Sequence, residues 1–151
     1  MTLHIVLDSS PLGLLSNPSS SADVLSISRW SRACIAAGHN LYVPEVIDYE
    51  LRRELLRADK TNGLAKLDSL KTLFYYLPIT TAAMLRAADL WAHSRRTGVS
   101  TGDPRKLDVD VILAAQALTL VAPSADVIVA TANVAHLSRF VSADLWTNIT
   151  P

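Results

Sequence analysis

The stretch Leu3-His-Ile-Val-Leu-Asp-Ser-Ser-Pro11 decides the fold class of this chain. Its first five residues are mostly apolar and end at a polar cluster, which is the pattern of a buried strand followed by a turn. Similar short apolar runs occur at residues 41–43, 73–79 and 126–131. Longer segments with apolar residues at helical spacing separate these runs. Strands that alternate with helices favour a parallel sheet covered by helices on both faces.

The segments between the apolar runs predict the helices. We expect them at residues 22–37, 45–59, 81–96, 108–121 and 133–140, with one more brief helix that ends near residue 70. Residues 8–11 are interpreted as a turn, residues 17–21 as a loop and residues 145–146 as a last edge strand. The sequence therefore predicts one α/β domain, residues 1–151, with a central parallel sheet of four to five strands flanked by helices on both faces.

Composition limits the classes of protein to which the chain can belong. Half of its 151 residues are hydrophobic, and fourteen Lys and Arg residues balance fourteen Asp and Glu residues. This balance excludes a strongly basic nucleic-acid-binding protein but is compatible with a local basic patch. A single cysteine, Cys34, excludes internal disulfides and zinc sites built from Cys pairs. Asp8 interrupts the apolar start and no apolar run could span a bilayer, so we expect a cytoplasmic protein.

Polar side chains follow two of the predicted strands at the same edge of the sheet. Asp8 comes directly after the first strand, and Thr131 and Asn133 lie where the fourth strand ends. The carboxyl ends of parallel strands form the ligand-binding edge of such sheets, so these residues are candidates for a functional site. Asp126 opens its strand and therefore belongs to the opposite edge.

Two predicted helices bring further carboxylates towards this edge. Glu50 lies next to the apolar stripe of the helix after the second strand, and Asp110 shares a helix face with Leu113 and Ala114. Carboxylates that converge on one edge repel one another unless a cation lies between them. Mg²⁺ and Mn²⁺ prefer such oxygen ligands, and either ion activates water for attack on a phosphodiester. We therefore expect two or three of these acids to share a Mg²⁺ or Mn²⁺ ion.

Four pieces of the sequence resemble, in order, the motifs of one known family. They are Ile5-Val-Leu-Asp-Ser9, Val43-Pro-Glu-Val-Ile-Asp-Tyr-Glu-Leu51, Asp110-Val-Ile-Leu-Ala-Ala-Gln-Ala-Leu118 and Asp126-Val-Ile-Val-Ala-Thr-Ala-Asn-Val-Ala-His-Leu137. Over nearly its whole length the chain resembles the PIN domain, the nuclease fold of VapC-type toxins. The resemblance implies a Mg²⁺- or Mn²⁺-dependent endoribonuclease that cleaves RNA with a metal-activated water, and a candidate toxin of a toxin–antitoxin pair.

The resemblance also implies roles for individual residues and for partners. Asp8, Glu50 and Asp110 match the metal-binding, catalytic acids of the family, and Ser9 and Thr131 match hydroxyl residues beside those acids. The implied partners are an RNA substrate, a small antitoxin protein that masks the acidic groove, and a second copy of the chain in a homodimer.

Several of these residues have a second interpretation. Asp108 is a good helix cap by residue type, and it stays an alternative or additional metal ligand beside Asp110. Asn133 stands where many family members carry a fourth acid, and it either caps the next short helix or holds a water as a further ligand. Ser9 and Thr131 form either turn hydrogen bonds or part of the site.

A basic stretch leads directly to Asp110. We expect its residues Arg95, Arg96, Arg105 and Lys106 to bind RNA phosphates, the alternative being an ordinary solvated surface. The neutral net charge and the missing fourth acid keep a second function open, a PIN-like scaffold without catalysis that binds RNA or a partner protein. A receiver-type regulatory module is disfavoured, because no acid ends the third predicted strand and no lysine follows Lys106.

Overall fold

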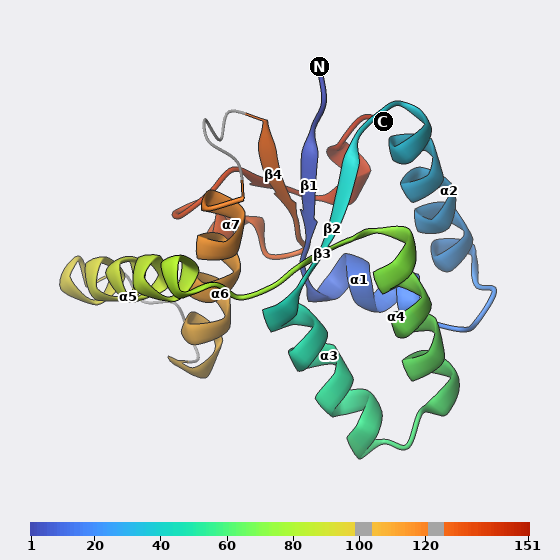
Figure 1. Cartoon of the computed structure of the whole chain (residues 1–151), viewed down its shortest axis with the longest axis horizontal. Coiled ribbons are helices and arrows are strands. Elements are labelled where there is room, and N and C mark those ends of the chain that lie inside the picture. Colours follow the sequence, from blue (N-terminus) through green and yellow to red (C-terminus); the bar gives the residue numbers. More distant parts are fainter. Residues whose placement is uncertain (99–103, 121–125) are drawn as a thin grey trace.

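The structure, a computed structural model, describes residues 1–98, 104–120 and 126–151, with the backbone alone at residues 104 and 105. Within these ranges five strands form one sheet, in the order β3-β2-β1-β4-β5, with every neighbouring pair parallel (Figure 1). The strands are β1 (His4–Leu7), β2 (Asn40–Pro44), β3 (Tyr75–Leu77), β4 (Val127–Ala130) and β5 (Ala143–Asp144). The α/β class and the parallel sheet predicted from the sequence are confirmed.

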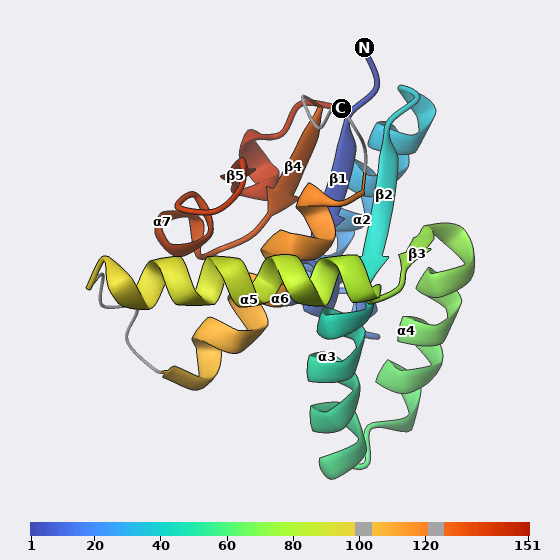
Figure 2. The same ribbon diagram turned by 60° about the vertical axis from the view of Figure 1, so that its left-hand side comes forward.

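Helices cover both faces of this sheet. They are α1 (Ser9–Ser16), α2 (Ala22–Ala36), α3 (Glu45–Arg57), α4 (Thr61–Leu73), α5 (Thr81–Arg96), α6 (Pro104–Leu118) and α7 (Val134–Leu137), followed by a 3-10 helix at Trp146–Asn148. Figure 2 shows α5 in front of the strands and α2 behind them. No helix within the described ranges is long and apolar enough to cross a membrane.

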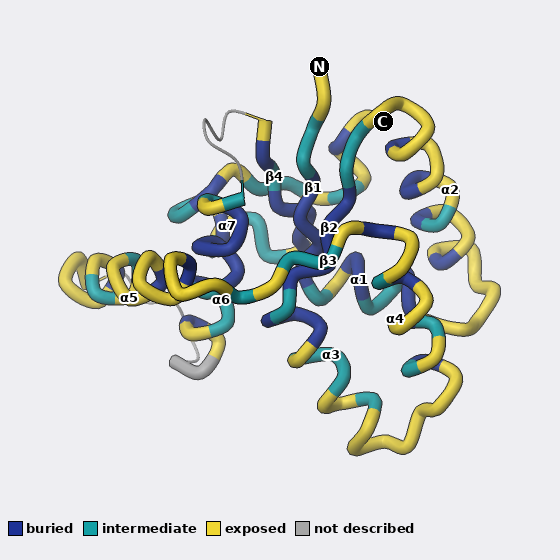
Figure 3. The backbone as a smooth tube through the Cα atoms, viewed as in Figure 1, coloured by how far each residue is buried: buried dark blue, intermediate teal, exposed yellow. Residues whose placement is uncertain are grey.

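Strand β1 lies at the centre of the molecule and fixes the position of the candidate site. Ile5, Val6 and Leu7 are fully buried, and β1 pairs with β2 on one side and β4 on the other. In Figure 3 the buried segments gather along these strands, whereas the outer sides of the helices are exposed. The chain moves outwards from β1 in opposite directions, towards β3 and towards β5, so the carboxyl ends of β1 and β4 form the switch point at which ligands bind in such sheets.

Helix α6 packs closely against the sheet because its inner face is built from small residues. Ala114 and Ala117 are fully buried with Leu113 in the main core. Ala115 and Val111 belong to a second, smaller core between α5 and α6. This packing sets the depth at which Asp110, one turn earlier than Ala114, enters the molecule.

The sequence interpretation missed helix α1. Residues 8–11 begin this helix instead of forming a turn, and Asp8 is its N-cap, with the side chain accepting a hydrogen bond from the Ser9 backbone N–H. Pro11 is compatible with the first turn of a helix, where its missing N–H has no intrahelical partner to lose. Leu12 and Leu15 are buried on the inner face of the helix. The Ser-Ser-Pro sequence signals a turn by composition, and burial of the two leucines outweighs that signal.

Other predicted boundaries also differ from the structure. The last strand is residues 143–144, and residues 146–148 form the 3-10 helix, so the edge strand predicted at residues 145–146 was placed too late. Trp146 packs on Trp30, whose indole N–H donates to the Ile149 carbonyl at 2.8 Å, and these contacts hold the segment as a helix instead of a strand. Helix α4 is a full helix, α6 begins at Pro104, and the predicted end of α6 at residue 121 lies outside the described residues.

Candidate functional site

Asp8 is held at the carboxyl end of β1 by two donors from different elements. Its Oδ1 accepts the Ser9 backbone N–H at 2.6 Å, and its Oδ2 accepts the Thr131 hydroxyl at 2.7 Å. Thr131 directly follows β4, and its Oγ1 also accepts the Asn133 backbone N–H at 2.8 Å. Because β1 and β4 are neighbours, this buried chain of hydrogen bonds fixes the orientation of the Asp8 carboxylate relative to both strands.

A small cavity of about 90 Å³ opens in front of Asp8. It is lined by Asp8, Ser9, Ser10, Glu50, Lys106, Val109, Asp110, Ala132 and Asn133. The three acids predicted from the sequence therefore reach one cavity from three separate elements, the β1–α1 junction, α3 and α6. A water molecule occupies roughly 30 Å³ in the liquid, so the cavity has room for one ion and a few waters.

The surroundings of Asp110 disfavour its charged form. Its residue is only 6% exposed, and its Oδ2 is buried without a hydrogen-bond partner among the described residues. Burial raises the pKa of Asp110 to about 6, and the charges of Asp8 and Glu50 add to this increase, whereas Lys106 and Arg139 oppose it. A carboxylate with an unpaired oxygen and two acidic neighbours is a strong attractor for a cation.

The residues fit a hard divalent cation, although they do not form a closed cage. All three acids offer oxygen ligands, and Asp110 Oδ2 has no competing partner. The two bonds to Asp8 leave lone pairs on its carboxylate, since each oxygen can accept more than one. As they stand, no three His, Cys, Asp or Glu side chains of the described residues are close enough to one another to form a ready-made metal cluster. Binding would require the acids to move towards the ion.

Glu50 is half-buried and faces the cavity from the second turn of α3. Two arginines follow Glu50 on the same helix, at spacings of three and seven residues, and both have other contacts. Arg57 pairs with Glu54 at 2.9 Å, and the guanidinium of Arg53 lies 5.2 Å from the centre of the Tyr49 ring. These contacts leave the Glu50 carboxylate available to the cavity.

The two additional ligand candidates lie in different places. Asn133 lines the cavity and occupies the N-cap position of α7, but its side chain makes no capping hydrogen bond and instead contacts His136 Nδ1 at 2.9 Å. Asp108 is exposed and lies in a groove between α5 and α6, beside Trp91 and Met84, away from the cavity. Of these two candidates the structure therefore brings only Asn133 to the acids.

The predicted basic residues divide in the same way. Lys106 is exposed and lines the acidic cavity. Arg95 and Arg96 are exposed at the end of α5, where the Arg95 guanidinium lies 5.6 Å from the centre of the Trp91 ring. The side chain of Arg105 lies outside the described residues.

Sequence reasoning missed Arg139. Its charge lowers the pKa of Asp110, its Nη2 is buried without a partner among the described residues, and its guanidinium stacks 5.0 Å from the centre of the Phe140 ring. Nothing in the local sequence distinguishes this arginine from a surface residue, because its proximity to Asp110 depends on the packing of α6 beside α7.

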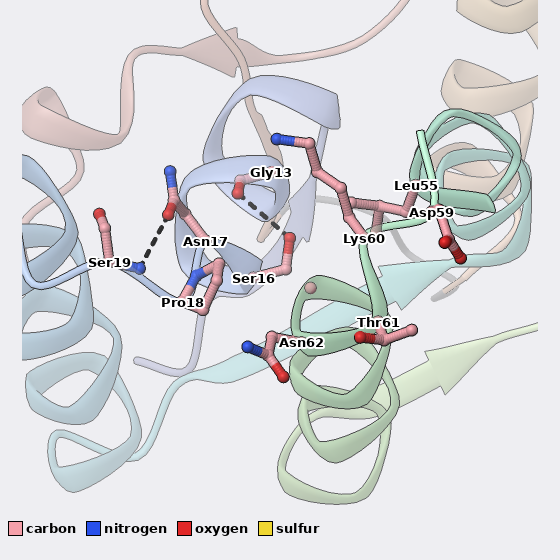
Figure 4. Close-up of a pocket in the computed structure, with 11 residues that line it drawn as sticks. Gly13, Ser16, Asn17, Pro18, Ser19, Leu55, Asp59, Lys60, Thr61 and Asn62 are labelled. Carbon is pink, nitrogen blue, oxygen red and sulfur yellow. Dashed lines mark hydrogen bonds between the residues drawn. The ribbon is translucent and has the colours of Figure 1, made fainter. Parts of the chain in front are cut away.

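A larger cavity among the described residues lies elsewhere and is lined by different groups. It measures about 730 Å³ and lies between the end of α1 and the start of α4 (Figure 4). Two of its polar side chains bond to nearby backbone, since Ser16 Oγ donates to the Gly13 carbonyl and Asn17 Oδ1 accepts the Ser19 N–H. Asp59 is its single carboxylate, so this cavity does not carry the acid chemistry predicted from the sequence.

Comparisons with known proteins identify the fold. No protein-family model matches the sequence, and no curated protein matches it. Solved structures do match. One is VapBC2 from Rickettsia felis bound to a DNA fragment from its promoter, with a TM-score of 0.70, 13% identity and coverage of 97% of this chain and 99% of that chain.

Two further solved structures match over a similar length. VapBC-1 from nontypeable Haemophilus influenzae has a TM-score of 0.66 and 15% identity, with 98% of this chain and 100% of that chain covered. FitAcB from Neisseria gonorrhoeae has a TM-score of 0.64 and 18% identity, with 96% and 99% covered. The chain therefore has the fold of chains found in VapBC complexes, and the resemblance to the VapC-type PIN domain is confirmed at the level of the fold.

Proposed function

We propose that this protein is a Mg²⁺- or Mn²⁺-dependent endoribonuclease and the toxin of a toxin–antitoxin pair, acting in the cytoplasm. The observation that carries the proposal is the unpaired, buried Oδ2 of Asp110 in a cavity that Asp8 and Glu50 also line. The shared fold with chains of VapBC complexes supports the same assignment. Two buried acids beside a half-buried third are costly for folding alone, and a divalent cation would offset that cost.

In this proposal Asp8, Glu50 and Asp110 hold the metal ion, and Asn133 contacts one of its waters. When bound, such an ion activates a water molecule and stabilises the charge that develops on the scissile phosphate. The Thr131 hydroxyl and the Ser9 N–H keep the Asp8 carboxylate oriented towards the cavity.

We assign Lys106 to the RNA backbone, because it lines the acidic cavity and is exposed. An ammonium group at this position attracts the phosphate on either side of the cleaved bond and partly offsets the repulsion between RNA and the acids. Arg95, Arg96 and Arg105 are proposed to extend this contact along the strand.

A second function is favoured by a specific observation. Asn133 replaces an acid at the cavity, and the acids do not form a ready-made cluster among the described residues. In this second proposal the protein binds metal only weakly and serves as a scaffold for RNA or a protein partner, without cleaving RNA. Cleavage assays separate the two functions.

The proposed protein partners are an antitoxin and a second copy of the chain. The solved structures that match include VapBC complexes, which supports a protein partner. We propose that this partner is an antitoxin that masks the acidic cavity. For the homodimer the support is an exposed apolar groove between α5 and α6, which Met84 and Trp91 line and where each is more than 40% exposed. An apolar groove of this kind is typical of an interaction surface. Purification of the protein from its native cells without any stoichiometric protein bound would contradict the antitoxin.

Cleavage of a labelled mixed RNA tests the nuclease directly. We expect the purified protein to cut RNA with Mg²⁺ or Mn²⁺ and to lose activity in EDTA. Asp8→Asn and Asp110→Asn should each lower the rate at least 100-fold, because each removes a metal ligand. Asp89→Asn, the same substitution at an exposed site on α5, is the matched control and should retain the wild-type rate. Equal cutting by all four proteins would indicate a contaminant and contradict the assigned acids.

In the metal-free protein, the buried Asp110 carboxylate should make the free energy of unfolding depend on pH. The pKa of the Asp110 carboxyl is raised from 3.8 to about 6 in the folded state. The folded protein is therefore most stable with this carboxyl protonated, below pH 3.8, and its free energy of unfolding falls as the pH rises through 6. Asp110→Asn should therefore stabilise the metal-free protein at pH 7.5, by on the order of 2 kcal/mol, and less at pH 5. Urea unfolding in EDTA measures both values.

Two controls complete the stability measurement. Asp89→Asn should leave stability unchanged at both pH values, since its carboxyl is exposed. Mn²⁺ should stabilise the wild type and have little effect on Asp110→Asn, because a ligand stabilises the folded state only at concentrations near or above its dissociation constant. An Asp110→Asn variant that is less stable than the wild type at pH 7.5 without metal would contradict the account of this cavity.

Light scattering tests the homodimer. We expect a solution mass of two chains for the wild type and of one chain for Met84→Asp, because a charge in the apolar groove between α5 and α6 opposes its burial. Leu25→Asp on α2 is the matched control, being an exposed leucine on another helix, and should stay dimeric. A monomeric wild type at micromolar concentration would refute this partner.

A further inference from the structure

A buried amide side chain connects the two helices that carry Glu50 and Asp110. Gln116 lies on α6 and is only 1% exposed. Its Oε1 accepts the Val46 backbone N–H at 3.4 Å, and its Nε2 donates to the Leu77 carbonyl at 2.7 Å. A single side chain on α6 therefore bonds to the first turn of α3 and to the last residue of β3.

The bond to Val46 replaces a cap that α3 lacks. The helix begins at Glu45, and its N-cap is Pro44, which makes no side-chain capping hydrogen bond. The N–H groups of a first helical turn have no intrahelical partner and are normally satisfied by an N-cap side chain. Here the acceptor comes from another helix, so the start of α3 is tied to the position of α6.

The bond to Leu77 adds the sheet to the same connection. Pro44 and Leu77 are paired across β2 and β3, and the Glu45 side chain accepts the Ile79 N–H at 2.7 Å just beyond β3. Gln116 therefore bonds to the junction of β2 and α3 and to the end of β3. Only a carboxamide of this length offers both the donor and the acceptor that the two backbone groups require.

This connection bears on the acidic cavity through helix geometry. Val46 lies one turn before Glu50 on α3, and Gln116 lies on the same helix as Asp110, six residues later. We infer that Gln116 is a positioning residue, which fixes α3 against α6 and so sets the separation of the Glu50 and Asp110 carboxylates for the metal ion. The inference rests on the proposed function, since it concerns metal binding by these acids.

Mn²⁺ titration of the full chain, followed by electron paramagnetic resonance, tests the inference. Gln116→Met keeps the length and volume of the side chain but removes both hydrogen bonds, and should weaken Mn²⁺ binding at least tenfold. Gln116→Asn keeps the amide and shortens its reach by one methylene group, and should show a similar loss. Val24→Ala is the matched control, because it removes buried side-chain volume on α2 and should leave Mn²⁺ affinity unchanged.

A second variant separates positioning from simple capping. Pro44→Ser places a good N-cap residue at the start of α3, so combined with Gln116→Met it supplies a local acceptor without a bond to α6. We expect the combined variant to recover thermal stability while its Mn²⁺ affinity stays low. Recovery of affinity together with stability, or unchanged affinity in Gln116→Met, would overturn the inference and leave the proposed function intact. A wild type that binds no Mn²⁺ would overturn both.

Discussion

Burial of the Asp110 carboxylate, with added repulsion from two neighbouring acids, is the constraint on which the candidate site depends. Asp8, Glu50 and Asp110 line a space of about 90 Å³, and burial together with the neighbouring charges raises the pKa of Asp110 to about 6. Both oxygens of Asp8 accept hydrogen bonds, whereas Asp110 Oδ2 has no partner among the described residues. This arrangement is costly for the metal-free fold, and perturbed carboxylates of this kind gather at functional sites, which is why we propose a metal ion here.

The scaffold around the cavity holds the acids in place against this repulsion. The central strand β1 is fully buried from Ile5 to Leu7, and Asp8 follows at its carboxyl end. The buried alanines of α6 let that helix lie close to the sheet, so that Asp110 faces the cavity. Gln116 joins α6 to the start of α3, the helix of Glu50. Each acid is thus anchored by backbone and core contacts that do not involve its own charge.

Much of this arrangement could be predicted from the sequence, and the exceptions have a common cause. The strand before Asp8 and the helix of Asp110 show clear local patterns, and their acids reach one cavity as the order of strands predicts. The Ser-Ser-Pro composition concealed α1, because burial of its leucines is a tertiary effect. The contacts of Gln116 and Arg139 depend on which helices pack side by side, which spacing along one segment does not record.

Anomalous X-ray scattering from crystals grown with Mn²⁺ tests the central claim most directly. The account predicts an anomalous peak within bonding distance of Asp8, Glu50 and Asp110, with Asp110 Oδ2 as a ligand and the carboxylates drawn closer together than in the metal-free protein. No peak at this cavity at millimolar Mn²⁺, with the unpaired Asp110 oxygen still buried, would contradict the account.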